Sequence, residues 1–399
     1  MTDKISYLMT NLPQGWEKVN FDDIFYNPSS KNYQLNTKDY LDKGYIPIID
    51  QSKKFIIGYS NNHEKVFKIN NCNNSCIIFG DHTRALKFID FDFIVGADGV
   101  KILSNKDIKR FNTKFLFFHL LYKNIPSLGY RRHFSILKQN ILNIPPIKEQ
   151  ERIVGILDFA FSKIDENIKK AKENLANIDE LMQSALQKAF NPLNDNTKEN
   201  YQLPQSWEWK SLDNIGEIIT GTTPSKNNPN FYGNEYPLFK PSDLNGDMII
   251  KYASDNLSKL GFDNARNIPK DTILVVCIGA SIGKIGLSGV SGSCNQQINA
   301  IIPNSKFLPK FLFFLCLSNY FQEILKNNAS QTTLPIINKT EFSKLQIPLP
   351  PLQEQEQIAE HLDFVFEKAK ALKELYTKEL KDYEELKQSL LDKAFKGEL

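Results

Sequence analysis

The segments of this chain that come nearest to a catalytic motif each lack an essential member. Residues 279–284 read GASIGK, one residue short of a phosphate-binding loop, and Ile285 stands where such a loop has Ser or Thr. Residues 144–147 read IPPI, which lacks both the polar first residue and the aromatic last residue of the tetrapeptide used by amino-methyltransferases. The first segment therefore predicts a tight turn between strands, and the second predicts a helix start.

The cysteines and histidines form no complete metal or nucleophilic motif. Cys72 and Cys76 are spaced for one face of a helix, but no further Cys or His lies nearby to complete a zinc site. His82 and His133 each lie near an arginine without an acid-base partner, so DNA contact suits them better than hydrolysis. The five cysteines are odd in number and far too sparse for a secreted disulfide framework, so we expect them to be reduced.

Polar and basic side chains gather in short segments that predict loops. Phosphate contacts come from Lys, Arg and small polar side chains, whereas Arg, Lys, Asn, Gln, Ser and Thr read base edges. The candidates for DNA contact in the first half of the chain are Asp81, His82, Arg84, Tyr130, Arg131, Arg132 and His133. Those in the second half are Thr223, Ser225, Lys226, Lys240, Ser242, Asp243, Asn295, Gln296, Ser330, Gln331, Thr332 and Thr333. The alternative for the Tyr-Arg-Arg-His run is a solvated loop.

The elements that must position these residues are written twice in the chain. LPQGWE at 12–17 recurs as LPQSWE at 203–208, PPIKEQERI at 145–153 as PPLQEQEQI at 350–358, and QSALQKAF at 183–190 as QSLLDKAF at 388–395. The last two pairs share an offset of 205 residues, whereas the first is offset by 191. The segment between the second and third motifs therefore keeps its length, as a spacer does, and the preceding module varies.

Each constant-length segment predicts a long helix. Pro-Pro followed by acidic residues is typical of a helix start. Apolar residues then recur at steps of three and four, at Ile153, Leu157, Phe161, Ile164, Ile168, Ala171, Leu175, Ile178, Met182, Ala185 and Ala189 in the first copy. Such stripes can pair, so we expect two antiparallel helices of about 66 Å with one module at each end. The alternative is a pair of surface helices packed on a globular core.

The two modules predict mixed folds and a basic surface. Short apolar runs between turn residues predict strands at 45–50, 54–60, 75–81 and 92–103 in the first module and at 237–244, 271–289 and 295–303 in the second. The apolar segments 115–123 and 310–326 predict buried helices. Residues 147–190 and 352–395 have net charges of −1 and −4, so the rest of a chain of net charge +3 has +8. A basic excess outside the helices is expected of surfaces that face a polyanion.

Length and composition favour a folded protein of more than one domain. The 399 residues exceed what one core usually serves, and 41% of them are hydrophobic. The most apolar segment, FLFFLCL at 311–317, is far too short to span a bilayer. We therefore expect a cytoplasmic protein without membrane contact.

Several of these motifs together resemble one family. LPxxWE, GTTPSKNNPNFYG at 221–233, GASIGKIG at 279–286, NQQINAI at 295–301 and PLPPLQEQ at 348–355 look like the target-recognition domain and spacer helix of type I restriction-modification specificity subunits. The first module resembles a second form of that domain through residues 46–59, 77–90 and 97–103.

The resemblance implies an α+β fold in which two globular target-recognition domains are joined by two long antiparallel coiled-coil-like helices, as a pseudo-twofold internal repeat. The expected division is 1–143 for the first domain, 144–190 for its spacer helix, 191–202 for a linker, 203–348 for the second domain and 349–399 for the second helix. Each domain is then expected to read one half of an interrupted site in double-stranded DNA, while the helices set the gap and dock two modification subunits.

The resemblance also implies that this chain performs no chemistry. It then has no catalytic residue, no metal and no cofactor of its own, because S-adenosylmethionine, ATP and Mg belong to the modification and restriction subunits of the full complex. The alternative is a self-contained DNA-modifying enzyme, either a methyltransferase or a nuclease. A bare structural scaffold is a third possibility, which two large basic modules of unequal length disfavour.

Overall fold

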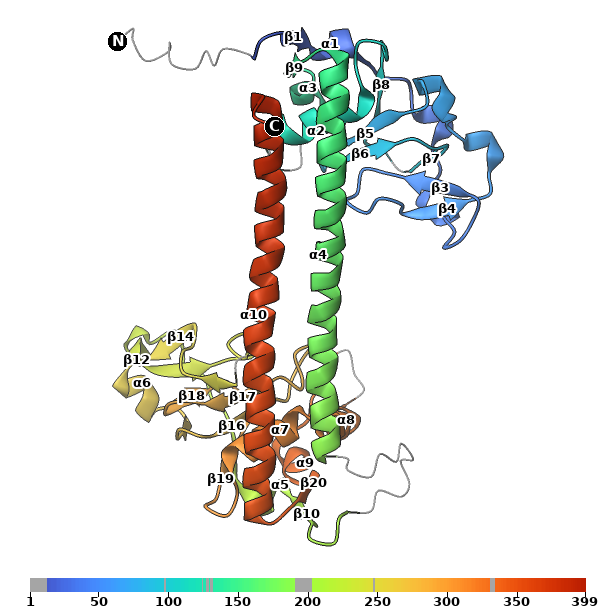
Figure 1. Cartoon of the computed structure of the whole chain (residues 1–399). Coiled ribbons are helices and arrows are strands. Elements are labelled where there is room, and N and C mark those ends of the chain that lie inside the picture. Colours follow the sequence, from blue (N-terminus) through green and yellow to red (C-terminus); the bar gives the residue numbers. More distant parts are fainter. Residues whose placement is uncertain are drawn as a thin grey trace, which may run out of the picture. The chain divides into compact units, whose positions relative to one another are not determined.

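The computed structural model describes residues 13–96, 98–123, 125–126, 129, 132–190, 203–246, 248–330 and 334–399. The chain forms two compact units, which we call unit 1 (Met1–Ala171 with Lys378–Leu399) and unit 2 (Lys172–Thr377). Each unit combines small β-sheets with helices and includes part of both long helices, α4 (Ile147–Phe190) and α10 (Leu352–Lys396) (Figure 1). The predicted α+β class with two long helices is confirmed.

Unit 1 contains two sheets and a separate strand pair. The four-stranded sheet has the order β2 (Phe25–Tyr26), β8 (Val100–Asn105), β5 (Cys76–Gly80), β6 (Leu86–Ile89), and the three-stranded sheet has the order β4 (Gly58–Ser60), β3 (Ile46–Ile49), β7 (Ile94–Val95). β1 (Glu17–Asn20) pairs with β9 (Ile141–Ile144). The short helices are α1 (Phe21–Ile24), η2 (Lys31–Tyr33), η3 (Thr37–Asp39), η4 (His63–Lys65), η5 (Ile69–Cys72), α2 (Thr113–Lys123) and α3 (Phe134–Leu137).

Unit 2 repeats this plan with one more strand in each sheet. Its five-stranded sheet has the order β11 (Gly216–Thr220), β19 (Ile298–Pro303), β16 (Ile273–Val276), β17 (Ile285–Ser288), β13 (Ile249–Ile250). Its four-stranded sheet has the order β14 (Asp255–Leu257), β12 (Tyr232–Phe239), β18 (Gly292–Cys294), β15 (Asn267–Ile268), and β10 (Glu208–Ser211) pairs with β20 (Gln346–Leu349). The remaining helices are α5 (Leu212–Ile215), η6 (Pro229–Phe231), α6 (Lys259–Asp263), α7 (Pro309–Leu317), α8 (Asn319–Asn327) and α9 (Lys339–Ser343).

The strand pairings show that the two units are structural repeats. In unit 1, β5 pairs antiparallel with both β6 and β8, and β3 pairs parallel with β7. In unit 2, β16 pairs antiparallel with both β17 and β19, and β12 pairs parallel with β18. Equivalent strands therefore occur in the same order along the chain, although the two modules differ in length. This equivalence lets each loop of one unit be matched to a loop of the other.

The repeated PPxxEQE motif is explained by a buried glutamine at each long-helix start. The Gln150 amide nitrogen donates to the carbonyl oxygens of Pro145 (2.8 Å) and Arg110 (2.9 Å), and its Oε1 accepts from the backbone N–H of Asn112 (2.7 Å). Gln355 repeats this arrangement in unit 2, donating to Pro350 and accepting from Leu308. Since both glutamines are buried, these bonds fix the start of each helix to the segment before α2 or α7.

Both long helices contribute to the core of unit 1, where they run antiparallel. Arg152 donates to the Leu399 carbonyl oxygen at 2.7 Å, and Asp165, further along α4, pairs with Lys387, which lies earlier on α10. Exposed ion pairs contribute little to stability. The main attachment is apolar: buried Leu157 of α4 and buried Phe395 of α10 belong to one hydrophobic cluster.

Unit 2 uses the same kind of attachment with the opposite ends of the helices. Leu186 and Phe190 of α4 share a hydrophobic cluster with Ala359 and Leu362 of α10. The ring of Phe190 packs edge-on against that of Phe311, with centroids 5.5 Å apart. The predicted apolar stripes are therefore core-forming surfaces.

Two details of the fold differ from or refine the sequence predictions. The segment 310–326, predicted as one helix, forms α7 and α8 because Ser318 is extended (φ −63°, ψ 150°) and its hydroxyl caps α8 by accepting from the Phe321 N–H. Cys72 and Cys76 lie on η5 and β5 rather than on one helix, and all five cysteines are buried and free. Among the residues described, no helix is long and apolar enough to span a membrane.

Candidate nucleic-acid interface

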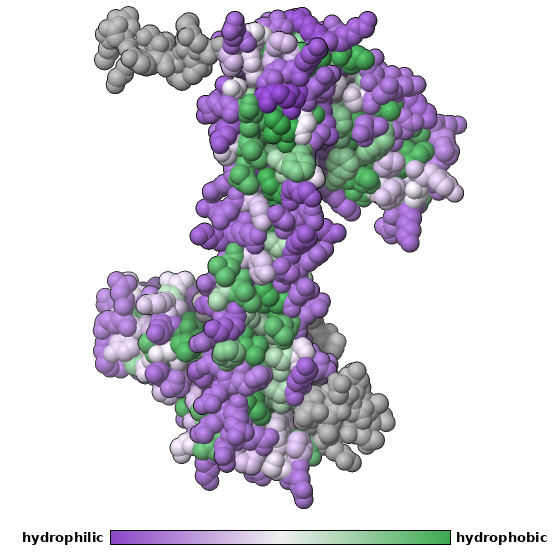
Figure 2. All heavy atoms as spheres, in the orientation of Figure 1, coloured by the Kyte–Doolittle hydropathy of each residue, from purple (hydrophilic) through white to green (hydrophobic). Residues whose placement is uncertain are grey.

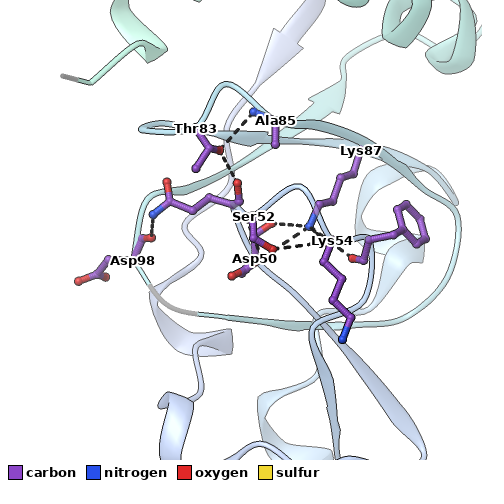
Figure 3. A network of polar contacts seen from close by, with 9 residues as sticks. Asp50, Ser52, Lys54, Thr83, Ala85, Lys87 and Asp98 are labelled. Carbon is purple, nitrogen blue, oxygen red and sulfur yellow. Dashed lines mark hydrogen bonds and ion pairs between the residues drawn. The ribbon is translucent and has the colours of Figure 1, made fainter. Parts of the chain in front are cut away.

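Three loops of unit 1 follow the ends of β3, β5 and β7 and lie together. We call residues 50–55, 81–85 and 96–99, except residue 97, loop cluster 1. The Gln51 side chain joins all three, because its amide nitrogen donates to the Asp98 carbonyl oxygen (2.9 Å) and its Oε1 accepts from the His82 N–H (3.2 Å). The Thr83 hydroxyl also donates to the Gln51 carbonyl oxygen (Figure 3). The loops therefore form one connected surface.

A buried lysine, Lys87, holds loop 50–55 from inside the protein. The Lys87 ammonium donates to backbone carbonyl oxygens of loop 50–55 and lies 3.6 Å from the Asp50 carboxylate (Figure 3). Burial lowers the pKa of Lys87, and the Asp50 charge opposes that shift. Lys53 and Lys54, in contrast, are exposed on the same loop. The loop thus presents two cations to solvent from a fixed backbone.

The structure places two predicted contact residues of unit 1 inside the protein. Asp81 and His133 are 3% and 0% exposed. The Asp81 carboxylate accepts from the Phe134 N–H (2.8 Å), and its carbonyl oxygen accepts from the backbone N–H of His133 (2.8 Å) and lies 3.0 Å from Nδ1 of that residue. In this conformation they hold the segment before α3 against loop cluster 1, so the geometry supports a positioning role. Their assignment as DNA contacts stays a prediction.

Two other predicted residues of unit 1, His82 and Arg84, belong to loop 81–85 of loop cluster 1. Arg84 is half-buried with a left-handed backbone (φ 62°), and its guanidinium donates to the Ile125 carbonyl oxygen at 2.8 Å. His82 is also half-buried, and Arg132 is exposed. Tyr130 and Arg131 lie outside the described residues.

The matching loops of unit 2 follow β12, join β16 to β17 and follow β18. We call residues 240–245, 277–284 and 295–297 loop cluster 2. The Lys284 ammonium donates to the Pro241 carbonyl oxygen at 3.3 Å and joins two of these loops. The GASIGK segment is a turn between strands, as predicted, and Gly279 and Gly283 have the positive φ angles of 92° and 91° that favour glycine there.

Most predicted contact residues of unit 2 lie on loop cluster 2 or beside it. Thr223 donates to the Gln296 side chain at 2.8 Å, which brings the 221–226 segment to the 295–297 loop. The Asp243 carboxylate accepts from the Lys240 N–H (2.8 Å) and the Ser254 N–H (3.0 Å). The exposed members are Thr223, Ser225, Lys226, Ser242, Gln296 and Ser330.

Some predicted residues of unit 2 are occupied in holding their loops. The Lys240 ammonium pairs with Asp255 and, with Lys226 nearby, lowers the pKa of that carboxyl group. Asn295 is nearly buried and bonds with Gln297 in both directions. Ser330 accepts from the Ile336 N–H at 3.1 Å, whereas Gln331, Thr332 and Thr333 lie outside the described residues.

Sequence patterns did not identify loop 50–54 of unit 1, which takes the place of the KPSD segment at 240–243 of unit 2. Residues 50–54 occupy the position of 240–244, because β3 pairs with β7 as β12 pairs with β18. The DQSKK sequence of this loop was visible, but the strand match that identifies it was not. Lys87 was missed as well, because a lysine that alternates with apolar residues in a strand usually faces solvent, whereas here Lys87 is buried and Leu86 and Phe88 are half-buried.

The exposed groups of both clusters are suited to nucleic acid rather than to catalysis. Apart from Asp98, their exposed polar side chains carry ammonium, hydroxyl and amide groups, which contact phosphates and base edges. Among the described residues no group of three or more His, Cys, Asp or Glu side chains is arranged to hold a metal ion. The fold and the two loop clusters define a two-domain DNA-recognition protein.

A second repeated feature lies on the long helices. Phe159 of α4 and Phe364 of α10 are 69% and 61% exposed, and they are separated by the 205-residue offset of the repeat. The preceding aspartate pairs with a lysine in each unit, as Asp158 with Lys114 (2.7 Å) and Asp363 with Lys310. Figure 2 shows hydrophobic side chains exposed among hydrophilic ones on each unit. An exposed aromatic residue kept in both copies indicates a contact surface.

Comparison with known proteins identifies the family. The model of the type I restriction modification DNA specificity domain matches residues 13–177 and 204–381. The chain therefore belongs to this family. It is a DNA specificity subunit of a type I restriction-modification system, and this subunit itself has no catalytic role.

Individual relatives agree with this assignment. The chain is 26% identical over 345 residues to the type I restriction enzyme EcoR124I/EcoR124II specificity subunit of Escherichia coli, covering 83% of this chain and 82% of that protein. It is 36% identical over 151 residues to the HindI specificity subunit of Haemophilus influenzae, covering 37% and 33% of the two chains.

Solved structures show the same fold. A chain from a study of complex assembly and conformational transition of the type I R-M system is similar with a TM-score of 0.71 at 21% identity, covering 97% of this chain and 99% of that one. The HsdS subunit from Thermoanaerobacter tengcongensis gives a TM-score of 0.52 at 20% identity, covering 97% and 98%.

Proposed function

We propose that unit 1 and unit 2 each read one half of a bipartite site in double-stranded DNA, through loop cluster 1 and loop cluster 2. The observation that carries this proposal is the repeat of one three-loop surface on equivalent strands, with different side chains on each copy. Equivalent surfaces with different residues are suited to two half-sites of different sequence. The basic excess outside the long helices supports contact with a polyanion.

We also propose that the long helices dock two modification subunits, one near Phe159 and one near Phe364. A buried aromatic anchor often dominates the free energy of a protein interface, and these two are exposed in matching surroundings. Two matched surfaces on one chain support a stoichiometry of two modification subunits. Restriction subunits then join through the complex, which works in the cytoplasm.

The partner subunits supply the chemistry in this proposal. S-adenosylmethionine for adenine methylation belongs to the modification subunits, and ATP and Mg²⁺ belong to the restriction subunits. The residues of this chain bind DNA and orient it for those partners. The proposed domain limits remain 1–143 and 203–348, with spacer helices 144–190 and 349–399 and a linker at 191–202.

Mapping methylated adenines tests the division of labour between the units. The chain is co-expressed with its modification subunit, and the methylated site is compared between the wild type, a variant of loop cluster 2 (Ser242→Ala with Gln296→Ala) and a variant of loop cluster 1 (Ser52→Ala with Thr83→Ala). Each variant is expected to relax the sequence at one half-site and to keep the other. Relaxation of both halves by one variant, or of neither half by either variant, contradicts the proposal.

A further inference from the structure

Lys87 is a buried lysine whose side chain supports a loop rather than the hydrophobic core. It lies on β6 opposite Ile78 of β5, and its side chain is 4% exposed. Its ammonium nitrogen lies 2.9 Å from the Asp50 carbonyl oxygen, 2.6 Å from that of Lys54 and 3.3 Å from that of Phe55 (Figure 3). Since an ammonium group has three N–H donors, all of them can be used on one loop.

The contacts of Lys87 make the loop dependent on its charge. The nearby carboxylate of Asp50 is the counter-charge, with its Oδ1 3.6 Å from the ammonium nitrogen. A buried charge is tolerated only when it is paired and hydrogen-bonded, and here both conditions are met by residues of loop 50–55. An apolar side chain at this position would leave three carbonyl oxygens without their donor and Asp50 without its cation.

The repeat shows that the fold itself does not require a lysine at this place. Ile78 pairs with Lys87 and with Ile102, as Leu274 pairs with Gly286 and with Ala300. Lys87 is therefore equivalent to Gly286 of unit 2. A Cβ atom on Gly286 would meet the side chains of Ile250 and, at 3.2 Å, Leu244. Unit 2 fills this place with apolar groups and holds its matching loop through Lys284 instead, so Lys87 serves the form that loop 50–55 takes in unit 1.

Loop 50–55 is held at both ends, and its exposed lysines lie between these attachments. Gln51 fixes one end to the rest of loop cluster 1, and the Ser52 N–H donates to the Asp50 carboxylate at 2.8 Å. Lys54 gives its carbonyl oxygen to Lys87, while its own side chain points away from the network (Figure 3). Lys53 and Lys54 are exposed.

We propose that Lys87 is a positioning residue for DNA recognition by unit 1, which fixes loop 50–55 so that Lys53 and Lys54 meet phosphate groups of one half-site. The proposal rests on the proposed function and adds the residue that sets the loop. Lys87 itself does not touch DNA. Its effect on binding passes entirely through the two exposed lysines, and this makes it separable from a general role in stability.

A double-mutant cycle tests the proposal in the full chain assembled with its modification subunits. The probes are a duplex with the mapped bipartite site and two duplexes with one half-site scrambled. The variants are Lys87→Met, the pair Lys53→Ser with Lys54→Ser, and all three together. Lys68→Met is the matched control, because Lys68 is an exposed lysine of the same unit that pairs with Asp92 at 2.8 Å and lies outside loop cluster 1.

Two lost phosphate contacts predict an affinity about 10- to 100-fold lower near 0.1 M salt, and a salt slope smaller by about 2. Lys87→Met and the double serine variant are both expected to show this loss. The scrambled duplexes are expected to assign it to one half-site. The triple variant is expected to bind no worse than the double serine variant, because the position of the loop matters only through its lysines. Lys68→Met is expected to leave affinity and slope unchanged.

Hydrogen exchange separates positioning from unfolding. In Lys87→Met, amides of residues 50–57 are expected to exchange faster while those of β5 and β8 stay protected. Unchanged affinity in Lys87→Met, or a further loss in the triple variant equal to that of Lys87→Met alone, overturns the proposal. If Lys87→Met loses protection in β5, its own affinity is not informative, and the test rests on the double serine variant. Unchanged DNA affinity and salt slope in the double serine variant then overturn the proposal. A wild-type complex that distinguishes neither half-site refutes the proposed function instead.

Discussion

Replacing His119 with leucine tests how unit 1 accommodates a buried titratable group. His119 lies in α2, within the sequence FLFFH at 115–119. The equivalent sequence of unit 2 is FLFFL at 311–315, so Leu315 occupies the matching position. It is fully buried, with its ring centroid 4.6 Å from that of Phe395 on α10. Its Nε2 accepts from the Asn143 N–H at 3.0 Å, and its Nδ1 has no hydrogen-bond partner in the described part of the chain. Burial, with a smaller effect from Lys123, lowers the pKa of His119 from 6.5 to about 3.

The sign and size of the effect follow from that shift. Below pH 6.5 the His119 imidazole is protonated in the unfolded chain but stays neutral in the folded chain. The free energy of unfolding therefore falls as the pH falls, down to about pH 3. One pH unit corresponds to about 1.4 kcal/mol. Between pH 7.5 and pH 5 the wild type should therefore lose about 2 kcal/mol through His119, and His119→Leu should not.

The assay is the urea dependence of hydrogen exchange in β5 of unit 1, measured at pH 7.5 and pH 5 for both proteins. Leucine loses the bond to Asn143, which lowers stability by about 1 kcal/mol at both pH values. The informative quantity is the free energy of unfolding of His119→Leu minus that of the wild type. This difference should be about 2 kcal/mol more favourable to the variant at pH 5 than at pH 7.5. His63→Leu, at an exposed histidine of η4, is the control for removing an imidazole. A stability difference that is the same at both pH values refutes the reasoning.

Three further predictions concern the helices. Phe159→Ser and Phe364→Ser should each leave a complex with one modification subunit by native mass spectrometry, and a complex that keeps both contradicts the docking surfaces. Inserting Leu-Glu-Ala-Leu after Leu175 adds about 6 Å of helix. Methylation mapping should then find the same half-sites, separated by a gap that is longer by about two base pairs. An unaltered gap between the half-sites would show that the helices do not set this distance. Gln150→Leu should destabilise unit 1 by about 2–3 kcal/mol, since it leaves a buried N–H and two carbonyl oxygens unpaired; a loss below about 0.5 kcal/mol in urea unfolding would show that water replaces these bonds.

The fold was largely predictable because its main signals are an internal repeat and local apolar patterns. The 205-residue offset and the stripes of Ile153, Leu157 and Ile164 predict the long helices, and the short apolar runs predict most strands. The split at Ser318 was not predicted, since a single serine in an apolar run is compatible with a continuous helix. In the structure its backbone is extended and its hydroxyl caps α8.

The candidate interface was less predictable because it depends on contacts between distant segments. The burial of Asp81 and His133 follows from hydrogen bonds across 52 and 53 residues. Gln51 and Lys87 were missed for the same reason, since only the strand order brings them under loop cluster 1. Polar residue types identified the loops, whereas the pairing of strands decided which side chains are exposed.

The participation of α10 in unit 1 has a consequence for how the protein is made. The first unit needs residues 378–399, and Phe395 covers the rings of Phe115 and Tyr122. During synthesis at about 5–20 residues per second, these residues emerge roughly ten to fifty seconds after the rest of that unit. The N-terminal domain thus cannot complete its core on the ribosome until residues 378–399 have emerged. A transcript truncated before the codons for residues 378–399 would leave the domain encoded first with apolar surface exposed.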